Sequence, residues 1–72
     1  MAHQRAKRYT LERSIDHTNW KHVAGFEEGQ PSRFGEPFDQ NIAIAEAISY
    51  RDRESRYRHP NEKEFVRIII EI

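Results

Sequence analysis

The chain of 72 residues contains no cysteine and only one methionine, one tryptophan, three glycines and three prolines. Without cysteine it can form neither a disulfide nor a thiolate metal site. Twelve basic and twelve acidic residues give a formal net charge of zero, which argues against a general binder of nucleic acid or membranes. No apolar run is long enough to cross a membrane, and the N-terminal sequence lacks the apolar segment of a signal peptide. We therefore expect a cytoplasmic protein with no membrane partner.

The composition indicates one small domain, residues 1–72, with a thin core. Hydrophobic residues make up 36% of the chain and charged residues 33%. A domain of this size buries only about 60% of the surface that its unfolded chain exposes, so it lies near the limit of independent stability. Small domains of this kind often gain stability from a partner. We expect a protein partner or a second copy of the chain, with a homodimer favoured.

The most regular segment is residues 38–58, which we predict to be a helix. Asp39 is the expected N-cap, because its carboxylate can accept a hydrogen bond from the first turn. Phe38 and Ala43 then occupy the two positions of a hydrophobic staple. At 100° per residue, five apolar side chains fall within an arc of roughly 160° that is expected to face a core. They are Phe38, Ile42, Ile44, Ala45 and Ile48.

Two strands are predicted before this helix. Residues 8–15 alternate apolar and polar side chains, with Tyr9, Leu11 and Ile15 on the apolar face. Residues 16–19 carry four turn-forming side chains. Residues 20–26 are rich in aromatic and β-branched residues and predict a second strand, with the face that carries Trp20 favoured for the core.

A long loop and a last strand complete the predicted fold. Residues 27–37 contain two prolines and two glycines without apolar periodicity, so we expect a loop, and residues 1–7 are expected to form a flexible tail. Residues 65–72 predict a third strand with four apolar residues, from Val66 to Ile72, on one face. The predicted class is α+β in the order β-β-α-β. Its three-stranded antiparallel sheet has the strand order 2-1-3, with the helix on one face.

The polar side chains do not predict an active site or a metal site. The four histidines lie in the tail, near turns or beyond the helix, without the spacing of zinc ligands. Ser14, Asp16 and His17 include the residue types of a hydrolytic triad, but near neighbours in one strand and turn cannot align nucleophile and base. The three glycines do not form a phosphate-binding loop. We expect no catalytic residues, no metal and no cofactor, and hence no enzyme.

Two surfaces are candidates for binding. The favoured one is the outer face of the sheet, which a single helix leaves uncovered, and its expected contact residues are Phe65, Arg67, Ile69 and Phe34. In the alternative, the loop that carries Phe34 folds over this face. The free edge of the last strand could also add to another sheet or to its own copy.

The second surface is the end of the helix, where arginine and tyrosine are concentrated. Arginines bind phosphates and aromatic rings stack on bases, so this end is the alternative site, for nucleic acid. Its residues are Tyr50, Arg51, Arg53, Arg56, Tyr57 and Arg58. Two acidic residues, Asp52 and Glu54, offset half of its positive charge. The favoured function is a small non-enzymatic protein-binding or accessory module, of a size typical of inhibitors and regulators of viral or mobile-element type.

Overall fold

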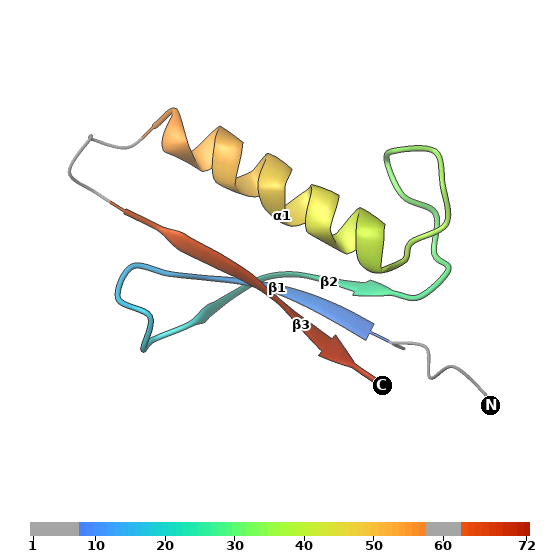
Figure 1. Cartoon of the computed structure of the whole chain (residues 1–72), viewed down its shortest axis with the longest axis horizontal. Helices are drawn as coiled ribbons and strands as arrows, with labels where there is room; N and C mark the ends of the chain where they lie inside the picture. Colours follow the sequence, from blue (N-terminus) through green and yellow to red (C-terminus); the bar gives the residue numbers. More distant parts are fainter. Residues whose placement is uncertain (1–7, 58–62) are drawn as a thin grey trace.

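The computed structural model describes residues 8–57 and 63–72, which form three strands and one helix (Figure 1). The strands are β1 (Arg8–Ser14), β2 (Lys21–Glu27) and β3 (Phe65–Glu71), and the helix is α1 (Gln40–Ser55). The predicted tail at residues 1–7 and the predicted role of Arg58 lie outside the described residues. The helix continues past Asp52, as far as Ser55, and ends three residues before the predicted limit.

The sheet confirms the predicted class and topology. The strand order is β2-β1-β3, and both pairs are antiparallel. Tyr9 lies opposite Ile70, Leu11 opposite Ile68 and Arg13 opposite Val66. Directly opposed side chains share a face of the sheet, so Val66, Ile68 and Ile70 lie on the face of Tyr9. Tyr9 and Ile68 both contact the core that α1 covers, which makes this the helix side of the sheet.

Among residues 8–57 and 63–72, only five apolar residues are buried: Tyr9, Leu11, Phe38, Ile42 and Ala43. The Phe38 ring lies at the centre, stacked on Phe26 with 4.4 Å between ring centroids and tilted against Tyr9 at 5.6 Å. Burial of the Tyr9 hydroxyl, together with its hydrogen bond to Glu28, raises the pKa of Tyr9 to about 12. The predicted thin core is therefore present, and it is built on aromatic rings.

The expectation that Ile15 belongs to the core is wrong. Strand β1 ends at Ser14, and the chain turns before Ile15, whose side chain is 71% exposed. Ser14 is buried instead, and its hydroxyl donates a hydrogen bond to the Asp16 carboxylate. Alternation predicts a face only while the strand lasts.

The expected core face of the second strand is correct for Ala24 and Phe26 and wrong for Trp20. The pairing of β1 with β2 shifts register between Leu11 and Glu12, so that Leu11 faces Ala24 while Glu12 faces His22. An extra residue in one strand reverses the face of every residue beyond it. Trp20 consequently lies on the outer side, where it packs against Arg67.

The start of α1 follows the sequence prediction. The Asp39 carboxylate accepts a hydrogen bond of 2.9 Å from the Ile42 backbone N–H. Phe38 and Ala43, the predicted staple, are both buried in the same cluster. The backbone of Phe38 is also held, because its N–H donates to the Gln30 carbonyl at 2.7 Å and its carbonyl accepts from Gly29 at 2.8 Å.

We expect Asp39→Ala to lower the free energy of unfolding by about 1 kcal/mol, the usual effect of removing an N-cap side chain. Urea unfolding followed by circular dichroism at 222 nm measures this loss. Asp52→Ala is the matched control, because Asp52 is exposed and lies inside α1. An equal loss in both variants would show that the cap does not stabilise the helix.

The predicted apolar arc of the helix is only partly correct. Ile42 is buried, but Ile44 and Ile48 are each 46% exposed, and Ala43 and Tyr50 face the sheet in their place. The small Ala43 side chain, which is fully buried, lets the helix lie close to β1 and β3. Among the described strands, β3 is the edge strand on that side of the sheet.

The loop predicted for residues 27–37 is observed at residues 28–39, and it lies on the helix side of the sheet (Figure 1). Arg33 donates a hydrogen bond of 2.7 Å from Nε to Glu46 of α1, which fixes the loop beside the helix. Phe34, next in the chain, is 44% exposed and stacks with Arg33. Within the described residues, no helix is long and apolar enough to cross a membrane.

Candidate protein-binding surface

The free edge of β3 is the starting point of the candidate surface. Among the described residues, β3 pairs with β1 on one side only, so the backbone groups on its other side have no strand partner there. The opposite edge strand, β2, is interrupted by the register shift and carries Lys21, His22 and Gly25. Bulges and charged residues protect an edge from further pairing. Strand β3 also carries two charged residues, Arg67 and Glu71, but it is regular over seven residues and free of proline, so it has less protection.

Four exposed isoleucines lie along this edge, and together with the edge of β3 we call them the β3-edge surface. Ile70 is 42% exposed and belongs to the helix-side face of β3, and Ile72, which follows the end of the strand, is 67% exposed. Ile44 and Ile48 project from α1 on the same side. Arg51 indicates which side this is. It lies seven residues after Ile44 and three after Ile48, and hence on the same helix face.

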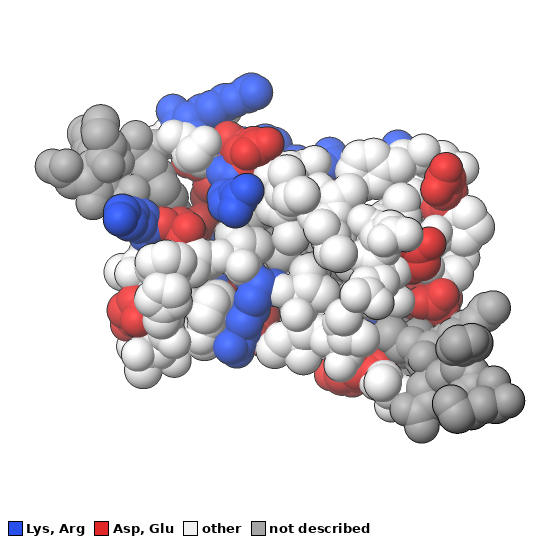
Figure 2. Space-filling view, viewed as in Figure 1, with Lys and Arg blue, Asp and Glu red and all other residues white. Residues whose placement is uncertain are grey.

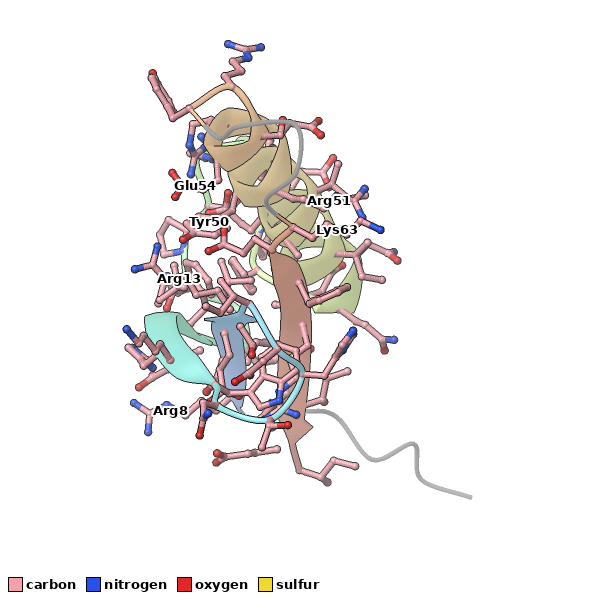
Figure 3. The ribbon with its side chains drawn as sticks, turned by 90° about the vertical axis from the view of Figure 1, so that its left-hand side faces the viewer. Arg8, Arg13, Tyr50, Arg51, Glu54 and Lys63 are labelled. Carbon is pink, nitrogen blue, oxygen red and sulfur yellow. The ribbon has the colours of Figure 1, made fainter. Side chains whose placement is uncertain are left out.

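The figures show how this surface is placed. In Figure 3, Arg51 and Lys63 lie on one side of α1, and Tyr50, Glu54 and Arg13 lie on the other. Figure 2 views the molecule from the side of Arg51, with β3 in front. It shows a broad area without charged residues, extending from the N-terminal half of α1 to the C-terminal half of β3. An apolar area beside the free edge of a strand is typical of a protein contact surface.

The sequence interpretation missed this surface, although one signal was present. It assigned Ile44 and Ile48 to the core and noted the β3 edge separately. The apolar arc of the helix is roughly 160° wide, which is wider than the stripe that one face of a three-stranded sheet buries. The excess arc pointed to a second contact, but its direction depends on how the helix is rotated above the sheet.

The outer sheet face holds three of the four predicted contact residues. Phe65, Arg67 and Ile69 lie opposite Ser14, Glu12 and Thr10 of β1, on the face away from the helix. Phe34 is not with them, because its loop is attached to α1 through Arg33. The loop therefore does not cover the outer face.

The connection between β1 and β2 covers part of the outer face instead. The His17 ring lies 3.5 Å from the Phe65 ring, centroid to centroid. Trp20 stacks on the Arg67 guanidinium at 4.0 Å. The same guanidinium donates a hydrogen bond of 2.9 Å from Nε to a Glu12 oxygen, which also lies 2.8 Å from Nη2. Phe65 and Arg67 thus already have partners within the chain, whereas the isoleucines of the β3-edge surface remain exposed.

Asp16 holds this covering turn in place. Its carboxylate accepts hydrogen bonds from the backbone N–H groups of Asn19 and Thr18, at 2.8 and 2.9 Å, and from the Ser14 hydroxyl. These hydrogen bonds lower the pKa of Asp16 well below 3.8, with the largest effect from Asn19 and smaller ones from Thr18 and Ser14. His17 adopts a positive φ of 66° next to it, a conformation rare outside glycine.

A pH dependence follows from this lowered pKa. Because the folded state binds the Asp16 proton more weakly than the unfolded state, the stabilisation is complete above the ordinary pKa of 3.8 and is lost as the pH falls below it. We expect Asp16→Ala to lower the urea midpoint at pH 7, with a smaller difference from the native chain at pH 2.5. Thr18→Ala serves as the control, since its backbone N–H to Asp16 remains. A difference independent of pH would contradict this assignment.

The arginine- and tyrosine-rich helix end does not form one outer stripe. Tyr50 points to the sheet, where its hydroxyl accepts a hydrogen bond of 2.9 Å from Arg13, and Arg13 also lies 3.6 Å from Glu54 and 3.9 Å from Glu64. The remaining members within the described residues are exposed: Arg51, Arg53, Arg56 and Tyr57. Tyr50 is therefore turned toward the sheet, whereas Tyr57, which follows the end of α1, is 84% exposed.

An open, acidic hollow of about 800 Å³ adjoins the β3-edge surface. It lies between the start of α1, the long loop and the end of β3, with Ile70 and Ile72 in its lining. Its carboxylates are those of Glu28, Glu36 and Asp39. The Glu28 carboxylate accepts a hydrogen bond of 2.6 Å from Tyr9, and Asp39 caps α1. Across residues 8–57 and 63–72, no three metal-ligating side chains gather as a metal site would require.

Comparison with known proteins adds no family to this description. No family model, curated protein or solved structure matches the chain.

Proposed function

We propose that this protein is a small non-enzymatic protein-binding module and that the β3-edge surface is its contact site. One observation carries the proposal. Four isoleucines are 42–67% exposed beside the edge of β3 that pairs with no described strand, in a chain whose described core holds five buried apolar residues. Leaving this much apolar surface in water costs free energy that a protein partner recovers.

The proposed contact site differs from the outer sheet face that the sequence favoured. Phe65 and Arg67 already pack against His17 and Trp20, so a partner there would have to displace the β1–β2 turn or bind over it. The β3 edge needs no such rearrangement. A strand from a partner can pair with its backbone while apolar side chains pack against Ile44 and Ile48.

Site-specific photo-crosslinking in the source cell tests this function. A photoreactive benzophenone amino acid at Ile48 is expected to form a covalent adduct with a protein, either another protein or a second copy. The same probe at Phe34 is the matched control, because Phe34 is equally exposed (44% against 46%) but lies in the loop attached to α1 through Arg33. Absence of adducts at Ile48, or equal adducts at both positions, would overturn the proposal.

A further inference from the structure

On the outer face of β3, two residues of opposite charge lie at equal distances on either side of Ile69. Arg67 precedes Ile69 by two residues, and Glu71 follows it by two. All three lie on the outer face, opposite Glu12, Thr10 and Arg8 of β1. If two identical β3 strands pair antiparallel around a two-fold axis at Ile69, Arg67 stands opposite the partner's Glu71, and Glu71 opposite the partner's Arg67.

We propose that the partner of the β3-edge surface is a second copy of this chain, paired β3 to β3 in this register. The inference rests on the proposed function and names its partner. The two sheets would join into one sheet of six strands, with both helices on the same side. A two-fold contact of this kind uses the same surface of each copy and closes on itself, which leaves no free β3 edge.

The charged residues distinguish this register from its neighbours. An axis at Ile68 places Arg67 opposite Ile69 and Glu71 opposite Phe65. An axis at Ile70 places Glu71 opposite Ile69. An axis at Arg67 or at Glu71 sets like charges directly against each other, which destabilises a strand pair. Among these five positions, only the axis at Ile69 gives each charged side chain an opposite charge.

The helix side of the sheet supports the same register. With the axis at Ile69, Ile70 stands opposite Ile68 of the partner subunit, and Ile72 opposite Val66 of the partner subunit. The exposed ends of Ile70 and Ile72 thereby gain apolar neighbours. Ile44 and Ile48 project over the same edge, so the two α1 helices would meet above the joined strands. Obligate dimer contacts are apolar in this way at their centre.

The ends of this side of the molecule also differ in charge. Arg51 and Lys63 lie near the start of β3, whereas the hollow with Glu28, Glu36 and Asp39 lies at its end. A two-fold axis near the middle brings Arg51 and Lys63 of each copy toward the acidic hollow of the other. This complementarity favours a second copy over an unrelated strand, whose charges would have no reason to match.

Cysteine crosslinking tests both the partner and the register, because the native chain has no cysteine. A residue on the two-fold axis meets its own counterpart, so Ile69→Cys is expected to form a disulfide-linked dimer under mild oxidation. Ile68→Cys and Ile70→Cys are the matched controls. Each lies diagonal to its own copy, at about 7–8 Å between Cα atoms, which is too far for a disulfide. Mixing these two variants is expected to give the crosslinked heterodimer that neither gives alone.

The remaining outcomes are also decisive. Sedimentation equilibrium of the native chain is expected to show a dimer, and Glu71→Arg is expected to raise its dissociation constant about tenfold, because it sets two arginines against each other. A native chain that stays monomeric at about 100 μM, a concentration well above the dissociation constants of specific dimers, would overturn the inference. So would crosslinking of Ile68→Cys or Ile70→Cys alone. Adducts of the Ile48 probe with a different protein would then leave the proposed function standing without this partner.

Discussion

Phe38→Ala is expected to remove a large part of the free energy of unfolding of the protein. Removing a buried phenylalanine costs about 3–5 kcal/mol, through lost burial and the cavity that remains. A chain of 72 residues has a total stability of roughly 4–11 kcal/mol, at about 0.05–0.15 kcal/mol per residue. Phe38 is 1% exposed and contacts both Tyr9 and Phe26, so α1 and two strands depend on it. Thermal and urea unfolding followed by circular dichroism measures the loss.

Phe34→Ala is the matched control for this prediction. The same residue type is removed from the same loop, four positions earlier, where the ring is 44% exposed. We expect a change within about 0.5 kcal/mol, as for most surface substitutions. Equal losses in the two variants would mean that Phe38 does not anchor the loop and helix to the sheet.

The double variant Ile44→Gln with Ile48→Gln is expected to abolish self-association while the fold is retained. Glutamine has at least the helix propensity of isoleucine, and the substitutions leave the charge unchanged, so α1 itself is not weakened. In the proposed dimer they remove four apolar side chains from the contact between helices. We expect the dissociation constant to rise about 100-fold or more, the effect of losing central apolar contacts.

Sedimentation equilibrium measures this constant, and circular dichroism confirms the fold. Phe34→Gln is the control, because it removes an apolar side chain of similar exposure away from β3. Since dimerisation adds to apparent stability, the native chain should unfold at a higher temperature as its concentration rises, and the double variant should not. A double variant that dimerises like the native chain would show that the contact does not involve α1.

Most of the fold was predictable because its signals are local. Asp39 identifies the helix start, alternation identifies β1 and β3, and residues 16–19 identify the turn. The misassigned side chains of the strands share one cause, a change in backbone geometry that alternation does not reveal. Ile15 is exposed because β1 ends before it, and Trp20 is on the outer side because the register shifts between it and Ala24.

The candidate site was predictable only in part. The sequence identified β3 as apolar on both faces and recognised its edge, because both follow from the residues of one strand. It could not show that His17 and Trp20 pack over Phe65 and Arg67, since these contacts join residues almost fifty positions apart. Nor could it place Tyr50, whose orientation toward Arg13 depends on how the helix meets the sheet.

The sequence by itself determined the elements, their order and the apolar character of α1 and β3, because capping, periodicity and turn chemistry act between near neighbours. Tertiary structure alone decided the rotation of α1 about its axis. The close approach of Ala43 to the sheet and the bond between Tyr50 and Arg13 turn the helix so that Ile44 and Ile48 extend beyond β3. Their exposure depends on where the sheet ends, which is a property of the packed molecule rather than of any segment.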